Sequence, residues 1–523
     1  IYGCLVGSEM CIRDRKFAKQ ISIPLCDIIN FSVKYGQWSK IYKKESVTPV
    51  PKTYPPKSPN DLRNISGLLT FNKIMEKMIG ELLVSDIMEN LDPAQYANQQ
   101  GVSLQHYLIK MINVILTDTD NSKKGEANAV IASLIDWKEA FPRQCPKLGV
   151  EAFIKCGVRN SLIPLLVNYL QDRTMTVKWN GKISTERKLN GGGPQGATFG
   201  IWEYLAQSNN SADFVDPNYR YKFVDDLTIL EKVNLLLVGL ASHSFKTDIR
   251  SDIPVHNQFI PAEHLKTKEY LERIKDWTIK QKMILNQKKT KVMIFNFTDK
   301  YKFTANLELN DEKLEVVNQA KLLGVIISDD LKWDKNTEYL VKKAYSRMEL
   351  LRKVAEFTKS IDDKREIYIL YIRSILEQSC VVWHSSLTEE NALDLERVQK
   401  AAIRLILGER YETYEDGLLR ANLESLKERR EKLCKTFAIK CVKSENPRVN
   451  NIFSKRKTKH GMDLRKDEKY EVKFAKTNRL KNSSVPYMQR ILNTDNLQFE
   501  KQELKRKKRF NGDKNIEKRR KLY

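Results

Sequence analysis

Three aspartates in this sequence could together bind a metal ion. Asp225 and Asp226 are adjacent and lie between two apolar stretches, and Asp136 directly follows the apolar run 129–135. Two carboxylates about 4 Å apart repel each other by ~1 kcal/mol in water and by ~4 kcal/mol at an effective dielectric of 20. A cation would remove this repulsion, and Mg²⁺ is commonly held by one or two carboxylates together with substrate phosphates. The three residues therefore define a candidate magnesium site.

The Asp-Asp pair on its own is weak evidence for such a site. The dipeptide occurs three times, at 225, 329 and 362. The pair at 362 precedes a helical pattern, where acidic residues favour the helix start, and the pair at 329 is typical of a turn. What distinguishes Asp225 is its context, because a Gly-Gly-Gly-Pro-Gln-Gly loop at 191–196 lies between it and Asp136. Such a loop lets the backbone approach a ligand closely.

Strands must carry these aspartates. The run 129–135 is short, apolar and rich in β-branched residues, which predicts a buried strand ending at Asp136. Residues 219–230 predict a strand, a turn on Asp225-Asp226 and a second strand. Further strands are predicted over 291–297 and 321–327.

The segments upstream and downstream have different patterns. Prolines in 46–62 predict a loop or an edge strand. Residues 70–90 predict a helix with Ile74, Met78, Leu82 and Ile87 on one face. Asn180-Gly181 predicts a hairpin turn. From about residue 336 the pattern is helical, whereas residues 242–266 have no clear period and predict an insertion or a long loop.

The charge is large and uneven. The chain has 523 residues and a formal charge of +25, and residues 446–523 contain 24 Lys and Arg but 9 Asp and Glu, a net charge of +15. This excess argues against an enzyme with a small neutral substrate and favours a polyanionic partner. Eight scattered cysteines without a Cys-x-x-Cys pair favour reduced thiols and an intracellular protein. No apolar run approaches the length of a membrane span, so we expect no membrane partner.

In its order of motifs the sequence resembles the reverse transcriptases of non-LTR retrotransposons, of the jockey-like kind. Six motifs carry the resemblance, and together they span about 46–335. The fingers motif is matched by two segments, and the five palm motifs follow it in order: Thr48–Lys52 with Asp61–Ser66, then Ile135–Phe141, Gly193–Gly196, Phe223–Asp226, Leu285–Thr290, and Leu323–Val325 with Leu331–Trp333.

The resemblance implies an α+β right-hand polymerase with fingers, a ferredoxin-like palm, a helical thumb and a basic tail. We expect fingers and palm at 46–335, a thumb-like region at 336–445 and a disordered tail at 446–523. Residues 1–45 would be an N-terminal remnant, and its first 15 residues resemble translated library-adaptor sequence.

The resemblance also implies the roles of the acidic site. Asp136 and Asp225 would ligate two Mg²⁺ ions, with Mn²⁺ as a possible substitute. Asp226 would be a third catalytic residue, and its alternative role is structural or electrostatic support of the turn. Lys289 is the candidate proton donor to pyrophosphate. Pro142 departs from the family, which has an aspartate at that position.

Nucleotide and primer contacts are implied by the same motifs. Lys52 and Arg63 would bind the triphosphate, and Gln195 would lie beside the incoming nucleotide. Phe141 would exclude a ribose 2′-hydroxyl. The primer grip would be formed by Leu323, Gly324 and Val325.

The implied activity is RNA-templated addition of dNTPs to a DNA 3′-end during retrotransposition. RNA template, DNA primer or target and dNTPs would be the partners, the nucleus would be the site of action, and we expect no endonuclease domain in this chain. One alternative is a catalytically inactive, reverse-transcriptase-derived protein that binds nucleic acid, for which Pro142 argues. An RNA-dependent RNA polymerase is a second alternative, which Phe141 disfavours.

Overall fold

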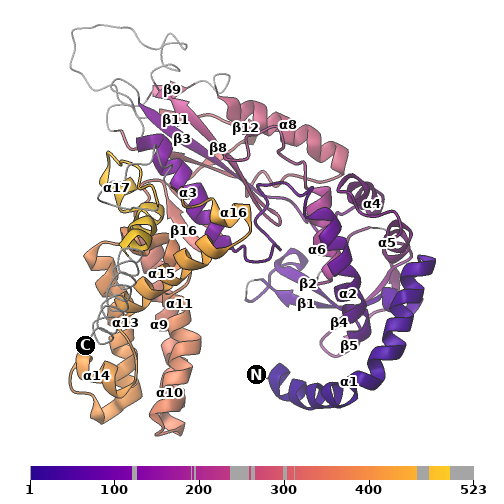
Figure 1. The fold of residues 1–523 in the computed structure, drawn as a ribbon, viewed down its shortest axis with the longest axis horizontal. Coiled ribbons are helices and arrows are strands. Elements are labelled where there is room, and N and C mark those ends of the chain that lie inside the picture. Colours follow the sequence, from indigo (N-terminus) through magenta and orange to yellow (C-terminus); the bar gives the residue numbers. More distant parts are fainter. Residues whose placement is uncertain are drawn as a thin grey trace, which may run out of the picture.

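The protein is described by a computed structural model in which helices and sheets form an arch (Figure 1). A sheet lies at the top, the N-terminal part extends down one side and a helical part extends down the other. This is the predicted α+β class, with the right-hand arrangement of fingers, palm and thumb. The residues described are 2–52, 54–120, 127–189, 191–193, 196–235, 258–260, 265–298, 303–310, 312–455 and 470–494, with side chains from residue 17.

The palm sheet has the strand order β14-β10-β3-β8-β7. Its strands are β3 (Asn128–Ile135), β7 (Arg220–Phe223), β8 (Asp226–Asn234), β10 (Lys291–Phe295) and β14 (Glu315–Val316). Side chains alternate between the two faces of a strand, so Val130 and Ala132 pack under helix α3 (Leu104–Asp120), whereas Ile131 faces helix α8 (Lys266–Gln281). Buried on both faces, β3 is the strand that its apolar run predicts.

The fingers contain a second sheet, built by five short strands: β1 (Lys44–Pro51), β2 (Leu62–Gly67), β4 (Thr174–Trp179), β5 (Lys182–Ile183) and β6 (Arg187–Lys188). The predicted hairpin turn is present, with Asn180 and Gly181 both at positive φ. β1 pairs with β4 only as far as Val47, so Pro49 and Pro51 lie beyond that pairing. Because β4 does not pair with β1 at these two positions, the N–H groups that the prolines lack are not needed for hydrogen bonds to β4.

Helices α1 (Tyr2–Tyr35), α2 (Thr70–Ile87), α4 (Pro146–Lys155), α5 (Ile163–Leu170) and α6 (Thr198–Gln207) complete the fingers side. The predicted inner face of α2 is correct at Ile87, which is buried, but wrong by one residue in the preceding turns. Met75, Ile79 and Leu83 are buried there, while Met78 and Leu82 are exposed. The adjacent apolar pairs along this helix allow either face, and packing against α5 and α6 selects the second of each pair.

Beyond the palm, a hairpin leads into the thumb. The single strand predicted over 321–327 is in fact two, β15 (Gln319–Leu322) and β16 (Val325–Ser328), joined by Leu323-Gly324. Seven helices follow: α9 (Asp334–Phe357), α10 (Ile361–Ile367), α11 (Ser374–Leu376), α12 (Cys380–Trp383), α13 (Glu389–Leu407), α14 (Tyr414–Arg420) and α15 (Leu426–Lys443). The helical character predicted from about residue 336 is confirmed.

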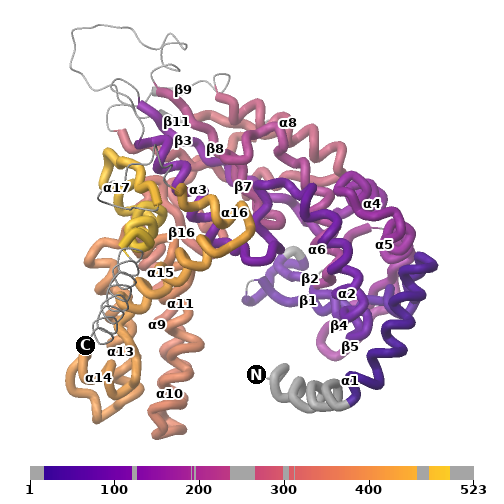
Figure 2. Tube along the Cα trace, viewed as in Figure 1, coloured from indigo at the N-terminus to yellow at the C-terminus, as the bar shows by residue number. Residues whose placement is uncertain are grey.

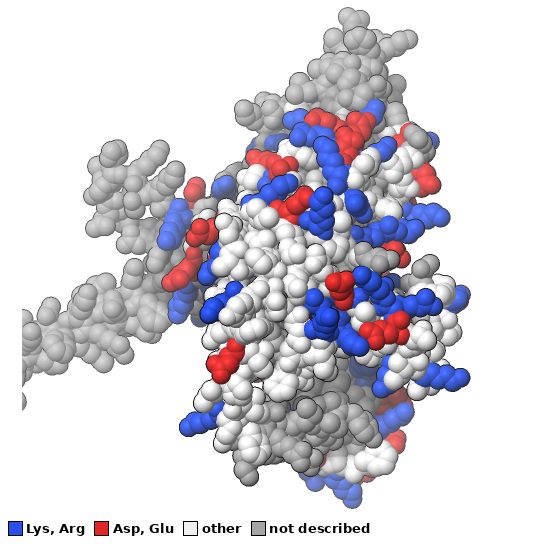
Figure 3. Space-filling model, turned by 90° about the vertical axis from the view of Figure 1, so that its right-hand side faces the viewer, with Lys and Arg blue, Asp and Glu red and all other residues white. Residues whose placement is uncertain are grey.

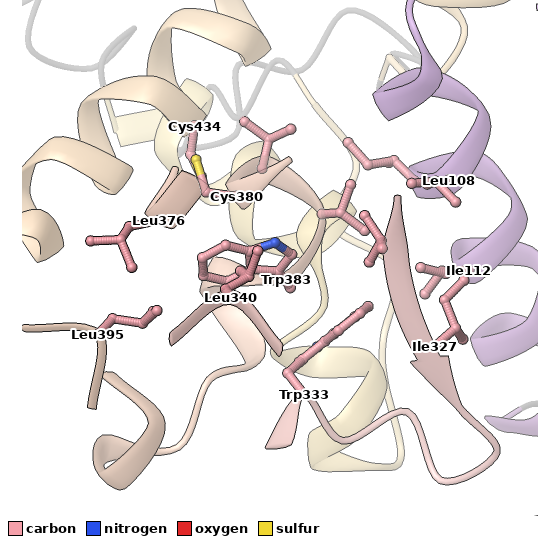
Figure 4. Packing of buried hydrophobic residues seen from close by; sticks show 14 of the residues in the cluster. Leu108, Ile112, Ile327, Trp333, Leu340, Leu376, Cys380, Trp383, Leu395 and Cys434 are labelled. Atoms are coloured by element: carbon pink, nitrogen blue, oxygen red, sulfur yellow. The ribbon is translucent and has the colours of Figure 1, made fainter. Parts of the chain in front are cut away.

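Palm and thumb share one hydrophobic core. Trp333, Leu340 and Trp383 pack together in it, and Leu108 and Ile112 of α3 approach from the palm side (Figure 4). The predicted boundary at 335–336 therefore lies inside one continuous core, just after α9 begins. The division into separate domains stays a prediction.

The predicted disordered tail is wrong for residues 446–455 and 470–494, which we name the C-terminal strap. It contains α16 (Pro447–Asn450) and α17 (Asn478–Lys481), and it lies beside α3 and the thumb (Figure 2). Phe474 is exposed, but most of the strap's large apolar side chains are buried: Val449, Phe453, Tyr470, Leu480, Val485, Met488 and Leu492. Disorder was predicted from the high net charge of this segment, which outweighed its apolar residues. Its two last basic clusters, at 505–509 and 518–521, lie outside the described residues.

Polar contacts fix the strap to the palm. The Asp120 carboxylate at the end of α3 accepts the backbone N–H groups of Lys476 and Thr477, each at 2.8 Å. The Arg448 guanidinium donates to the carbonyl oxygens of Leu91 and Pro93 at 3.1 and 3.0 Å. The strap is thus tied to two separate parts of the palm.

The outer side of the fingers carries little charge. Figure 3 shows few acidic or basic side chains over the centre of this face. Large apolar side chains of α1 are exposed, namely Phe17, Ile21, Ile23, Ile28, Phe31 and Tyr35. Among the helices described, none combines the length and hydropathy needed to cross a membrane.

Candidate active site

Strand register brings the three aspartates together. Asp136 directly follows β3, and Ile135 pairs with Leu227 of the antiparallel strand β8. Asp226, the first residue of β8, therefore lies beside Asp136 at the same edge of the sheet. The predicted turn is off by one residue, because Phe223 pairs with Asp226 and the two-residue turn is Val224-Asp225.

The backbone of this turn is strained. Val224 has φ of 56°, a conformation that a β-branched residue rarely adopts. Such a residue costs about 1–3 kcal/mol and persists only when its surroundings impose it. The carboxylate of Asp225 thus follows a backbone conformation that the neighbouring structure has to maintain.

Burial raises the pKa of all three carboxyl groups, and repulsion between carboxylates adds to the rise at Asp226 and Asp136. The pKa of Asp226 is raised to about 6 by burial and then by the charges of Asp225 and Asp136. Burial also raises the pKa of Asp136 and of Asp225, although Asp225 is the most exposed of the three side chains. The three groups therefore form a site that attracts positive charge.

Asn286 orients the Asp136 carboxylate. Its side-chain amide donates to Asp136 Oδ2 at 2.8 Å, and its backbone N–H donates to the Asp136 carbonyl at 2.9 Å. Thr290 closes this turn by donating its hydroxyl to the Asn286 carbonyl at 2.9 Å. The motif Leu285–Thr290 singled out Lys289, whereas Asn286 makes the direct contact, and only its place in the same motif could have indicated it.

Lys289 lies beside the acidic site with its side chain exposed. Its positive charge opposes the rise in the pKa of Asp136. Together with Asp136 and Asp226 it lines a cavity of about 410 Å³, whose other wall includes Lys321 and Leu322 of β15. The cavity thus joins the aspartates to the predicted primer-grip hairpin.

The predicted grip is a tight turn. Leu323 and Gly324 both have positive φ, 48° and 85°. Gln378 of the thumb donates to the Gly324 carbonyl at 3.4 Å, and a Cβ on Gly324 would lie 2.8 Å from the Gln378 Nε2 atom. The positive φ therefore favours glycine at position 324, where the Gln378 side chain contacts this turn. Val325 opens β16 and is buried.

Phe141 is half-buried and stacks on the ring of Tyr204, with ring centroids 5.2 Å apart. Burial raises the pKa of Tyr204, and the three aspartates raise it further, so this aromatic pair borders the acidic site. Phe141 thus lies where a side chain could contact a bound nucleotide.

The glycine-rich loop is fixed by a residue that the sequence did not single out. The Gln144 side chain accepts the N–H of Gly193 at 3.1 Å and donates to the Gly200 carbonyl at 3.1 Å. Gly192 has φ of 85°, and a Cβ there would lie 2.8 Å from the Pro142 carbonyl oxygen. Gln195 lies outside the described residues.

The two predicted triphosphate ligands lie on the fingers hairpin. The backbone N–H of Lys52 donates to the Asp61 carbonyl at 2.7 Å, which closes the loop between β1 and β2. Both Lys52 and Arg63 are exposed, and the Arg63 charge opposes the rise in the pKa of Asp225. Arg63 is thus within electrostatic reach of the acidic site.

The donor set fits a hard cation that also has substrate oxygens as ligands. Within the described residues, no group of three or more His, Cys, Asp or Glu side chains is arranged to hold a metal ion by itself. Two carboxylates completed by phosphate oxygens remain compatible with Mg²⁺. Neighbouring carboxylate charges add to the rise in the pKa of Asp226 and of Asp136, and a cation would relieve this repulsion.

No family model matches the chain. The chain is 27% identical over 357 residues to the probable RNA-directed DNA polymerase from transposon BS of Drosophila melanogaster. The aligned residues cover 67% of this chain and 37% of that protein. It is 24% identical over 365 residues to the polymerase from transposon X-element of the same organism, covering 68% and 36%. The chain thus spans little more than a third of these relatives.

Among solved structures, apo telomerase from Candida tropicalis aligns with 81% of this chain and 71% of its own, at 13% identity and a TM-score of 0.37. At this score the solved structure adds nothing to the assignment. The assignment depends on the two curated relatives and on the order of the motifs. By sequence, the chain is similar to the RNA-directed DNA polymerases of these two transposons, and this similarity agrees with the order of its motifs.

Proposed function

We propose that this chain adds dNTPs to a DNA 3′-end on an RNA template, in the service of retrotransposition. The observation that carries the proposal is the convergence of Asp136, Asp225 and Asp226 at one edge of the palm sheet. Similarity to transposon RNA-directed DNA polymerases supports it. The chain spans only part of those relatives, so RNA-directed DNA synthesis by this chain alone is a proposal.

In this proposal Asp136 and Asp225 hold two Mg²⁺ ions, for which Mn²⁺ can substitute. Such ions lower the pKa of an attacking hydroxyl and stabilise the leaving oxygen of an in-line displacement. Asn286 keeps the Asp136 carboxylate oriented through its 2.8 Å hydrogen bond. Asp226 is the third catalytic carboxylate in this proposal, and Lys289 gives a proton to pyrophosphate.

Substrate contacts come from three directions. Lys52 and Arg63 approach from the fingers and bind the triphosphate, for which the planar guanidinium is suited. Phe141, held by its stack on Tyr204, excludes a ribose 2′-hydroxyl. Leu323-Gly324-Val325 hold the primer end, and Gln195, which is outside the described residues, is assigned to the incoming nucleotide by its motif alone.

The partners in this proposal are an RNA template, a DNA primer or target and dNTPs. The basic clusters at 505–509 and 518–521 suit non-specific nucleic-acid binding or nuclear import. We also propose the division into fingers and palm at 46–335 and thumb at 336–445.

Primer extension on an RNA template with Mg²⁺ tests the activity. Asp136→Asn and Asp225→Asn should each abolish incorporation, because each removes a carboxylate charge from the site. Asp362→Asn is the matched control, since it alters an exposed Asp-Asp pair that is ion-paired to Arg365 at 2.8 Å. Full activity in either site variant would refute the assignment.

The alternative of a catalytically inactive nucleic-acid-binding protein gives a different result. In that case the wild-type chain would bind a primer–template duplex in a gel-shift assay yet extend no primer with either metal. Incorporation of ribonucleotides in preference to dNTPs would instead indicate an RNA polymerase.

A further inference from the structure

The outer edge of β7 is covered by an irregular segment, residues 92–99. β7 is the last strand of the palm sheet, and its outward-facing groups at Lys222 pair with this segment. The Lys222 N–H donates to the Ala94 carbonyl at 2.9 Å, and the Tyr96 N–H donates to the Lys222 carbonyl at 2.9 Å. Segment 92–99 thus continues the sheet for one residue pair.

Two residues further along β7, the next outward-facing N–H belongs to Val224 in the catalytic turn. No backbone carbonyl of segment 92–99 reaches it in the described structure. The side-chain oxygen of Gln95 accepts it instead, at 3.3 Å. A side chain therefore completes the edge pairing at the residue whose φ is 56°.

The Gln95 oxygen is itself held in place. The side chain is 2% exposed, and the same oxygen accepts the Ala97 N–H at 3.0 Å. The Gln95 backbone is fixed at both ends, because its N–H donates to the Asp92 carbonyl at 2.9 Å and its carbonyl accepts the Gln99 amide at 2.5 Å. The acceptor is therefore set before any substrate arrives.

Buried charges lock this segment to β7. The Asp92 carboxylate pairs with Arg220 at 2.9 Å and with Lys222 at 2.6 Å, and all three side chains are buried. Removing the Asp92 carboxylate would leave both buried cations without their acidic partner. The distance between Gln95 and the catalytic turn is thus determined by the fold.

We propose that Gln95 is a positioning residue, which fixes the Val224-Asp225 turn and through it the place of the Asp225 carboxylate. The inference rests on the proposed function and adds a residue that none of the six motifs contains. Gln95 acts through the Val224 N–H and not on substrate.

Gln95→Met tests the proposal, because it keeps the length of the side chain and removes the accepting oxygen. Gln207→Met is the matched control, since Gln207 is 1% exposed and makes a single hydrogen bond, to the Gln281 carbonyl, away from the turn. Gln95→Glu is the conservative variant that retains an accepting oxygen. Melting curves of all three variants show whether each of them is folded.

Single-nucleotide incorporation separates positioning from binding. In Gln95→Met we expect kcat to fall roughly 10- to 100-fold, because small misplacements of a reacting group have effects of that size. The KM for dNTP should stay within about two-fold, since the triphosphate is bound from the fingers. Gln95→Glu should recover part of the loss, and Gln207→Met should match wild type.

Mn²⁺ binding measured by electron paramagnetic resonance gives a readout that needs no turnover. Gln95→Met should bind Mn²⁺ more weakly than Gln207→Met. Equal Mn²⁺ affinity and equal kcat in these two variants would overturn the inference. A wild-type chain that extends no primer would overturn the proposed function instead, and the Mn²⁺ comparison would still decide the role of Gln95. If Gln95→Met does not fold, Gln95→Asn withdraws the oxygen by one methylene and serves in its place.

Discussion

Glu203 on α6 is a buried carboxyl for which the structure shows no hydrogen-bond partner at either oxygen. It lies beneath the glycine-rich loop, and a Cβ on Gly149 or Gly193 would lie 2.5 or 3.3 Å from its oxygens. Burial raises the pKa of Glu203 from 4.5 to about 8. We predict that Glu203→Gln stabilises the protein, and that the gain depends on pH.

Because the pKa of Glu203 is higher in the fold than in the unfolded chain, this carboxyl makes the fold less stable as the pH rises. Below pH 4.5 the carboxyl is protonated both in the fold and in the unfolded chain, so burial carries no ionisation cost. As the pH rises toward 8, the unfolded chain loses the proton first, and stability is lost progressively over this range. At 1.36 kcal/mol for each pKa unit, the loss at pH 8 is on the order of 5 kcal/mol as an upper bound.

The assay is thermal unfolding of wild type and Glu203→Gln at about pH 5 and about pH 8. The Tm advantage of the variant should be small at the lower pH and large at the higher. Glu76→Gln is the matched control, because Glu76 is also buried but accepts from Asn72, Tyr169 and Thr198 at 2.8–2.9 Å. An amide there would meet donors, so that variant should be destabilised by about 1–3 kcal/mol. A Glu203→Gln advantage of equal size at both pH values would refute burial as its cause.

Three further changes have distinct expected outcomes. Phe141→Ala should allow ribonucleotides to be incorporated, because it removes the ring that excludes the 2′-hydroxyl; the ratio of kcat/KM for rNTP and dNTP measures this. Arg63→Gln should raise the KM for dNTP with a smaller effect on kcat, and an unchanged KM would contradict a triphosphate contact. Asp120→Asn replaces one of the two carboxylate oxygens by an NH₂ group, so only one of the N–H groups of Lys476 and Thr477 keeps its acceptor. Hydrogen exchange of residues 476–480 should therefore become faster, while exchange in α13 stays as in wild type.

The sequence predicts the local structure correctly where one physical rule allows only one conformation. The run ending at Asp136 is apolar on both faces, and only a buried strand satisfies it. The Asn180-Gly181 turn needs two residues at positive φ, which these two tolerate. In α2, by contrast, adjacent apolar pairs permit two faces, and only packing decides between them.

The contacts that orient the site join residues far apart in the chain. Asn286 is 150 positions from Asp136, and Gln95 is 129 positions from Val224. No spacing rule connects such pairs, so the motifs indicate the aspartates but not these contacts, although Asn286 itself lies within the motif Leu285–Thr290. The hairpin at Leu323-Gly324 was missed because a leucine at φ of 48° is not a residue that marks a turn.

The C-terminal strap has a consequence for the way this chain folds during synthesis. Its N–H groups at Lys476 and Thr477 meet Asp120 across 356 and 357 positions of sequence. Domains ordinarily fold from the N-terminus while the ribosome is still translating, but α3 acquires this cap only after the thumb has emerged. A nascent chain or a copy truncated after α15 would therefore leave the palm with the uncovered surface that normally receives the strap. Helix α3 is thus completed by a segment that is synthesised 356 positions after it.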